Sequence, residues 1–242
     1  MSYIFREHIK QSLAVIAFLI TLTACTSESY DAGDGPNSYL TADLVLLHTS
    51  QDKSVRSALL DDGTTLQFSN PFAQDWLTRP DSVYRALLYY DKTVAASDAA
   101  ASNSMATSIV RARSVRPVSV LRPVEAEDME TLRTDPVGFE SLWMSKNKSY
   151  INLSLLLKSG KTEADDALHA LGIVSHGTTT DADRRRTLHL TLYHDQGGVP
   201  AYYTVQQYVS IPTQLLEEAD TIELTLNTYN GKKVVKVAVS NL

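Results

Sequence analysis

Apolar residues follow two patterns in this 242-residue chain, one near the N-terminus and one in the remainder. Residues 13–20 form an unbroken apolar run, and Arg6 and Lys10 precede it. A helix that spans a membrane needs about 20 apolar residues, so this run is too short for one. Its length and its flanking positive charge are typical of a secretory signal peptide. The pattern therefore predicts that residues 1–24 are removed on export.

The segment after the apolar run carries the only cysteine of the chain. Leu22, Thr23 and Ala24 come directly before Cys25, and this arrangement is a lipobox. A lone cysteine in an exported chain cannot form an internal disulfide, so it is either a free thiol or modified. Its position predicts that Cys25 becomes a lipidated N-terminus, whose acyl chains would hold the protein on a membrane. We expect no cofactor.

Residues 25–37 are small, acidic or turn-forming, and they bury too little apolar surface to order. We expect this segment to be a flexible tether. Acidic residues soon after a lipidated cysteine are also similar to the export signal of cell-surface lipoproteins in some Gram-negative anaerobes. The expected location is the outer membrane, and both a spacer and a surface-export role stay open for this segment.

A series of short β-like runs follows the tether, at residues 39–48, 55–60, 64–68, 83–90 and 109–120. Asp61, Asp62 and Gly63 join the second run to the third, as in an Asp-Gly hairpin. A stretch rich in alanine and serine, residues 95–108, precedes the fifth run. Five strands with one long loop before the last predict an OB-like five-stranded barrel over residues 38–121.

Alternation becomes stronger beyond an acidic connector at residues 122–134. In residues 150–157 the odd-numbered positions are all isoleucine or leucine, whereas the even-numbered ones are Tyr, Asn, Ser and Leu. Similar runs occur around residues 188–192, 203–209, 222–226 and 235–239, and Asn-Gly joins the last two as a hairpin. The fold class is therefore all-β, with a C-terminal antiparallel β-sandwich over residues 135–242 whose sheets have an apolar inner face and a wet outer face.

Residues 162–171 fit two kinds of element. Helix formers and an acidic start favour a short helix, whereas His169, Leu171 and Ile173 alternate as in a strand. We expect a loop or helical turn up to Asp166 and a strand over residues 168–174.

Charge narrows the class of partner. Without Arg6, Lys10 and Glu7, the 22 basic and 28 acidic residues leave a net charge near −7. A negative surface repels phosphate backbones, so we expect no binding of nucleic acid. The hydrophobic share of 43% is ordinary for a globular protein, and the core must hold the fold without disulfides.

Catalytic and metal-binding patterns are missing from the sequence. It has no Gly-x-Ser-x-Gly, no His-Glu-x-x-His and no phosphate-cradling glycine loop, so we expect neither an enzyme nor catalytic residues. His189 and His194 would point to opposite faces of one strand, which favours polar surface histidines over a metal site. Residues 184–186 are three arginines, which suit either an anion site or, as we favour, a charged hairpin tip.

Aromatic residues are the candidate binding residues. OB folds bind oligosaccharides, and aromatic side chains can serve as stacking platforms there. Strand alternation points either Tyr202 and Tyr208 or Tyr203 outward, and core or edge packing is the alternative role for such tyrosines. The candidates are Trp76, Trp143, Tyr202, Tyr203 and Tyr208.

The order of several short motifs resembles the NigD-like lipoproteins, a family named for a member encoded beside a nigrescin-type bacteriocin. The matching segments are residues 61–66, 88–91, 135–137, Trp143, 150–153, 188–194 and 209–211. The resemblance implies an OB domain followed by a β-sandwich on a lipid anchor, and it does not imply an enzyme. It favours a protein that binds a macromolecular partner, as in bacteriocin immunity, and the alternative is a glycan-binding surface lipoprotein.

Overall fold

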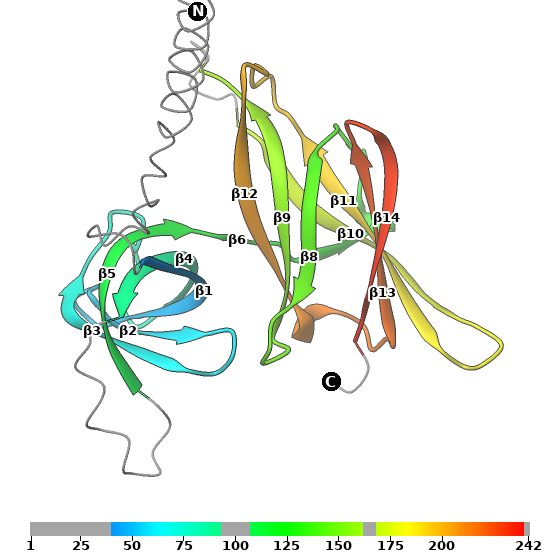
Figure 1. The fold of residues 1–242 in the computed structure, drawn as a ribbon. Helices are drawn as coiled ribbons and strands as arrows, with labels where there is room; N and C mark the ends of the chain where they lie inside the picture. Colours follow the sequence, from blue (N-terminus) through cyan, green and yellow to red (C-terminus); the bar gives the residue numbers. More distant parts are fainter. Residues whose placement is uncertain (1–39, 93–106, 162–167, 240–242) are drawn as a thin grey trace, which may run out of the picture. The chain divides into compact units, whose positions relative to one another are not determined.

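The computed structural model describes residues 40–92, 107–161 and 168–239, and the described residues from Thr41 onward form one compact unit (Figure 1). Cys25, the lipobox, the tether and most of the stretch 95–108 lie outside the described residues. Within these ranges, no helix is both long and apolar enough to cross a membrane.

The first five strands close into a barrel in the order β1-β2-β3-β5-β4, as the sequence predicted. They are β1 (Leu40–Thr49), β2 (Val55–Leu60), β3 (Thr65–Phe72), β4 (Val83–Lys92) and β5 (Thr107–Pro117). β3 and β5 pair in parallel, whereas β1–β2, β2–β3 and β4–β5 are antiparallel, which is the OB arrangement. The predicted turn between β2 and β3 is present, with Gly63 at a φ of 88° and Asp62 Oδ1 accepting from the Thr64 N–H.

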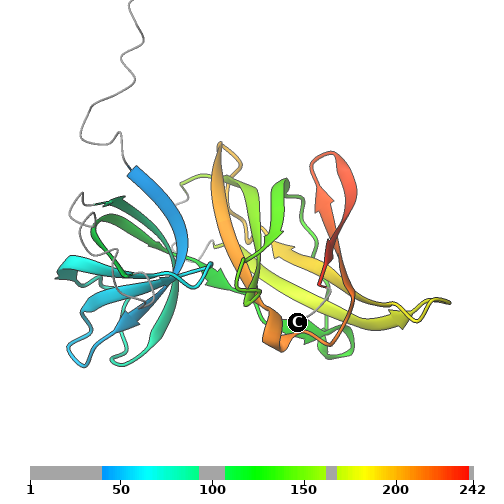
Figure 2. The same cartoon turned by 60° about the horizontal axis from the view of Figure 1, so that its bottom comes forward.

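The remaining strands form a β-sandwich of a five-stranded and a four-stranded sheet (Figures 1 and 2). The five-stranded sheet has the order β14-β13-β11-β10-β7, and the four-stranded sheet has the order β6-β12-β9-β8. The elements are β6 (Ser119–Val120), β7 (Pro123–Glu125), the 3-10 helix η3 (Ala126–Asp128), β8 (Gly138–Met144), β9 (Tyr150–Ser159), β10 (Ala170–Thr180), β11 (Arg186–Asp195), β12 (Tyr203–Pro212), the 3-10 helix η4 (Thr213–Leu215), β13 (Thr221–Thr228) and β14 (Gly231–Ala238).

Most ladders of the sandwich are antiparallel, and three pairings are parallel. β8–β9, β9–β12, β10–β11 and β13–β14 run antiparallel, whereas β6–β12, β7–β10 and β11–β13 run parallel. Strand β7 lies inside the segment 122–134, which the sequence predicted to be a connector. The predicted domain limits stay predictions. β10 begins two residues later than predicted, and residues 162–167, on which the helix alternative mainly rested, lie outside the described residues.

The inner faces of the two sheets form one apolar core, which includes the odd-numbered residues of β9. The even-numbered residues Asn152 and Ser154 are also buried, at 0% and 2% exposure, as is Ser210 on β12. A wholly wet outer face was predicted for this sheet, and that prediction is wrong here because barrel residues contact it. Arg85 of the barrel donates hydrogen bonds to both Asn152 and Ser210.

Candidate functional site

A buried arginine joins the barrel to the outer face of the four-stranded sheet. Arg85 lies on β4, is 4% exposed, and donates from Nη1 and Nη2 to the two carboxylate oxygens of Asp61 at 2.6 and 2.7 Å. From the same guanidinium, Nη2 reaches Asn152 Oδ1 at 3.0 Å and Nε reaches Ser210 Oγ at 3.1 Å. The guanidinium carbon also lies 4.4 Å from the centre of the Tyr150 ring. A planar guanidinium with this many fixed partners holds the two parts in a defined arrangement.

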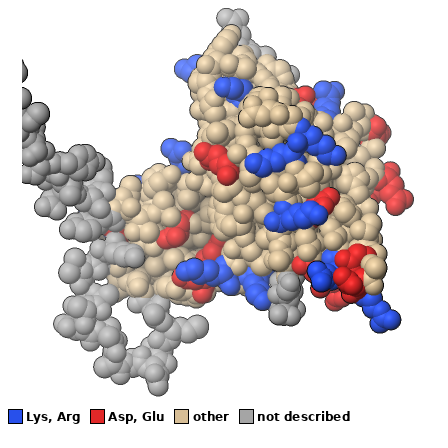
Figure 3. All heavy atoms as spheres, turned by 45° about the vertical axis from the view of Figure 1, so that its right-hand side comes forward, with Lys and Arg blue, Asp and Glu red and all other residues tan. Residues whose placement is uncertain are grey.

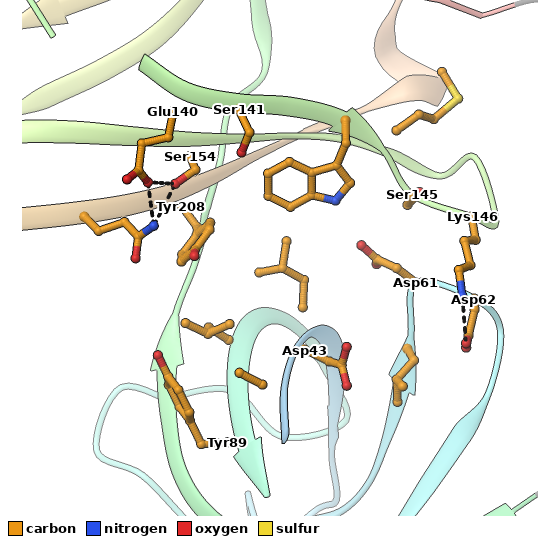
Figure 4. Close-up of a pocket in the computed structure, with 17 residues that line it drawn as sticks. Asp43, Asp61, Asp62, Tyr89, Glu140, Ser141, Ser145, Lys146, Ser154 and Tyr208 are labelled. Atoms are coloured by element: carbon orange, nitrogen blue, oxygen red, sulfur yellow. Dashed lines mark hydrogen bonds and ion pairs between the residues drawn. The ribbon is translucent and has the colours of Figure 1, made fainter. Parts of the chain in front are cut away.

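Beside this network lies a cavity of about 420 Å³, which we call the junction groove (Figure 4). Strands β1 and β4 and the β2–β3 turn line it on the barrel side, and β8, β9 and β12 line it on the sandwich side. Its polar and aromatic lining residues are Asp43, Asp61, Asp62, Tyr89, Glu140, Ser141, Trp143, Ser145, Lys146, Ser154, Gln206 and Tyr208.

The groove has an aromatic wall. Trp143 and Tyr208 meet edge to face, with ring centres 6.3 Å apart and planes at 82°. These two rings and Tyr89 pack against a small apolar cluster of Leu44, Leu87 and Val118 at the junction. The indole N–H of Trp143 has no hydrogen-bond acceptor among the described residues. The wall therefore combines fixed rings with a donor that is free for a ligand.

The acidic rim of the groove is built by a β-bulge. The β8–β9 register shifts between Phe139 and Ser141, so Glu140 is the extra residue that the bulge re-aims. Its Oε2 accepts hydrogen bonds from Ser154 Oγ at 2.6 Å and from Gln206 Nε2 at 2.5 Å. The bond from Ser154, followed by that from Gln206, lowers the pKa of Glu140 below 4.5, so this carboxylate is ionised at neutral pH.

The β2–β3 turn supplies two more carboxylates. Backbone and side-chain hydrogen bonds from Thr64 lower the pKa of Asp62, and the nearby Lys146 ammonium acts in the same direction. Lys146 Nζ lies 3.9 Å from Asp62 Oδ2 and its side chain is 82% exposed. The Asn147 N–H donates to the Asp61 carbonyl at 2.7 Å, so the turn after β8 contacts the barrel turn directly.

The structure brings together two of the five aromatic candidates, Trp143 and Tyr208. Trp76 packs edge to face on Tyr84, with ring centres 5.8 Å apart, against the barrel core. Tyr202 and Tyr203 are 79% and 51% exposed at the start of β12 and line none of the cavities described here. Tyr208 lies five positions after Tyr203 along the strand, which corresponds to about 16 Å.

Sequence reasoning missed Arg85, Glu140 and Tyr89. A signal was present in β4, where the even-numbered positions face the barrel core but Leu87 and Tyr89 occupy the opposite face. Large apolar residues on both faces of a strand indicate that both faces are covered. The β-bulge that places Glu140 interrupts the alternation of β8. The sequence of β8 therefore contains no pattern that indicates where Glu140 points.

Several histidines and arginines outside the groove contact other protein groups or lie in an exposed turn. His169 Nδ1 lies 3.0 Å from Nε2 of the buried His194, whose Nδ1 bonds the Asp135 carbonyl oxygen. Among the described residues, no group of three or more metal-ligating side chains occurs. Residues 184–185 lie in the exposed turn between β10 and β11, and Arg186 pairs with Glu218 at 3.2 Å. Positive and negative side chains are interspersed over the face drawn in Figure 3.

Comparison with known proteins assigns the fold. Residues 120–239 match the model of the NigD-like C-terminal beta sandwich domain. A NigD-like immunity protein from Bacteroides caccae is 22% identical with a TM-score of 0.59, over 81% of this chain and 91% of that one. A protein provisionally named a lipoprotein, from Bacteroides fragilis, is 14% identical with a TM-score of 0.57, over 83% and 98%.

A protein provisionally named toxin-related, from Parabacteroides distasonis, is 18% identical with a TM-score of 0.54, over 82% of this chain and 92% of that one. Similarity at these identities concerns the fold, which includes the barrel and the sandwich. No curated protein matches the chain. Residues 120–239 of the chain therefore belong to the NigD-like family, and the described barrel and sandwich share their fold with these solved structures.

Proposed function

We propose that this protein is a non-enzymatic, lipid-anchored envelope protein that binds a protein partner through the junction groove, in a role similar to bacteriocin immunity. The observation that carries the proposal is the groove itself, an aromatic and acidic cavity between two β domains. A NigD-like immunity protein and a toxin-related protein among the similar structures support a role in toxin defence.

The aromatic wall of the groove has the composition of a protein-binding site. Tryptophan and tyrosine in a concave, partly desolvated setting contribute most to the affinity of protein interfaces. Trp143 and Tyr208 are fixed by their mutual contact and by the apolar cluster at the junction. The Arg85 network already holds the two sides of the groove in place. Binding of a partner would therefore carry only a small entropic cost for ordering the site.

The carboxylates of the groove are poor candidates for catalysis. Asp61 is paired with Arg85, and Oε2 of Glu140 already accepts two hydrogen bonds. A general acid requires a carboxyl group with a raised pKa, whereas the pKa of Glu140 is lowered. These surroundings support binding rather than a reaction.

Anchoring would follow from lipidation of Cys25 after removal of residues 1–24. Two or more acyl chains give stable membrane attachment. We propose that the protein is anchored in the outer membrane and that residues 25–37 separate the barrel from the lipid surface. We further propose that the protein is exposed at the cell surface.

Glycan binding is the second candidate. The indole N–H of Trp143, which has no acceptor among the described residues, favours it, because Glu140 and Gln206 line the same groove. Sugars are bound by aromatic faces next to hydrogen-bonding side chains, and OB folds provide such sites. Tyr202 and Tyr203 line neither of the two cavities at the junction, so the glycan alternative depends on the groove as well.

The test is crosslinking on intact cells that carry the lipidated protein, followed by identification of the captured molecule. We expect a specific protein that is captured by the wild type and by Tyr203→Ala, is depleted for Trp143→Ala, and is lost with Cys25→Ala. Circular dichroism should verify that the Trp143 variant is folded. Capture of polysaccharide alone would favour the glycan alternative, and equal capture by both aromatic variants would contradict the groove as the binding site.

A further inference from the structure

We propose that the junction groove receives a cationic side chain, an arginine or a lysine, from a basic segment of the protein partner. The inference rests on the proposed function, because it names the chemistry that the same groove recognises. Its three supports are the charge of the groove lining, the aromatic wall and the place of Lys146.

The first support is charge. Asp43, Asp61, Asp62 and Glu140 line the groove, whereas Lys146 is the one basic residue among the lining side chains. The guanidinium of Arg85 pairs with Asp61 and neutralises its charge. The other three carboxylates against the single lysine still leave the lining with an excess of negative charge. The mature chain is also acidic overall, which favours the approach of a basic partner.

The second support is the aromatic wall. A cation is attracted to the face of a tryptophan or tyrosine ring, and tryptophan is the strongest partner. The described residues already include such contacts, with Arg85 over Tyr150 at 4.4 Å, Lys233 over Phe139 at 4.7 Å and Lys158 over Tyr229 at 5.8 Å. Trp143 and Tyr208 make no such contact with a described cation, although four carboxylates line the same groove.

The third support is the ammonium group of Lys146 at the rim. Its 3.9 Å distance to Asp62 and its 82% exposure describe a weak, solvent-screened pair. A cation that enters the groove would compete with this ammonium for the carboxylates of the same lining. Lys146 therefore acts as an internal competitor for the site, and its removal should strengthen binding of a cation.

The groove also has a suitable size. A cavity of about 420 Å³ lies at the lower end of the range for small-ligand sites. A second cavity of about 250 Å³ shares Leu87, Tyr89, Gln206 and Tyr208 with it. The shared residues make the two cavities neighbours along the junction, so the backbone that carries the cationic side chain can continue beside the groove.

The two tryptophans of the chain supply the test. In ¹⁵N-labelled protein each indole N–H gives one NMR signal, and Trp76→Phe assigns them. The probe is the peptide acetyl-Gly-Arg-Gly-amide, compared with the same peptide containing citrulline, which keeps the shape and loses the charge. We expect the arginine peptide to shift the Trp143 signal saturably, with a dissociation constant in the millimolar range, while the Trp76 signal stays in place.

Charge variants sharpen the result. Glu140→Gln and Asp62→Asn should each weaken arginine binding about threefold to tenfold, whereas Lys146→Gln should strengthen it about twofold to threefold. Asp75→Asn is the matched control, since Asp75 is an exposed barrel carboxylate that lines none of the cavities described here, and it should leave affinity unchanged. Equal binding of the citrulline peptide would overturn the inference.

Failure of this inference differs from failure of the proposed function. If arginine and lysine peptides leave the Trp143 signal unshifted, the cationic specificity is wrong. Capture of a protein that depends on Trp143 would then still support the groove as a binding site. If an oligosaccharide shifts the Trp143 signal and the arginine peptide does not, the glycan alternative replaces the cationic one.

Discussion

Strand β12 presents tyrosines in opposite settings at its start and in its middle. At the start, Tyr202 and Tyr203 are exposed and stand next to the turn that precedes the strand. In the middle, Tyr208 packs against Trp143 and the junction cluster, and it lines a cavity with four carboxylates. The difference shows that exposure alone is a poor guide to a site, because a ligand needs fixed rings together with oriented polar groups.

The contrast has its origin in what covers the sheet. The barrel contacts the four-stranded sheet near Asn152 and Ser210, and residues of both parts enclose the cavity that Tyr208 lines. The strand start at Tyr203 has no equivalent neighbour in the described part of the chain. We therefore expect changes at the junction to affect stability and binding, and changes at the exposed tyrosines to affect neither.

The largest effect should come from Arg85→Ala. The substitution leaves Asp61, Asn152 and Ser210 without their shared donor, and removal of one partner from a buried ion pair costs about 3 kcal/mol. Chemical denaturation followed by fluorescence should show a reduced free energy of unfolding and separate transitions for the two domains. Arg116→Ala, an exposed change on the neighbouring strand β5, should cost less than about 0.5 kcal/mol. Equal costs would show that Arg85 does not hold the junction.

Trp143→Ala should have the next largest effect on stability. The half-buried indole packs against Tyr208 and the junction cluster, so we expect a loss of about 2 kcal/mol in the free energy of unfolding. Tyr203→Ala should change it by less than about 0.5 kcal/mol. Urea denaturation of both variants measures the difference. A loss for Tyr203→Ala as large as that for Trp143→Ala would remove the contrast between the start and the middle of β12.

A smaller effect concerns Glu140 and acid. Its pKa in the folded protein is below 4.5 because Ser154 and Gln206 donate to the carboxylate. The stability that this contributes is present above pH 4.5 and is lost as the pH falls through the folded pKa. Glu140→Gln should therefore make the melting temperature depend less steeply on pH below 4.5. Glu127→Gln, on the exposed helix η3, is the control that should preserve the slope.

The smallest effect should come from His169, at the end of the sandwich away from Tyr208. Burial, and to a lesser extent the charge of His194, lowers the pKa of His169 in the folded protein. The unfolded state takes up the proton more readily, so stability is complete above about pH 6.5 and falls as the pH drops through the folded pKa. His169→Gln should reduce this fall, as measured by melting temperatures over that window. His48→Gln, an exposed change in the barrel, should not.

Several motifs that carried the family resemblance meet at the junction. Asp61 comes from the barrel hairpin, Asn152 from the β9 motif and Ser210 from the β12 motif, and all three bind Arg85. Arg85 itself lies outside every one of those motifs. The resemblance thus contained most partners of the network without the residue that connects them.

The sequence by itself determined most of the strands, although not β7 and β8, and it determined the Asp-Gly hairpin and the apolar inner face of the sandwich. These features depend on residues close together in the chain, where a period of two assigns each side chain to one face. It also identified Trp143 and Tyr208 as candidates, although with no means of separating them from Tyr202 and Tyr203.

Only the tertiary structure decided which outer face is covered and where the groove lies. Alternation states which residues share a face, but it does not state what packs on that face. The contacts that decide this join residues far apart in sequence, such as Arg85 with Asn152 and with Ser210. For that physical reason, the burial of Arg85 and the aim of Glu140 could not be deduced from the local pattern of either strand.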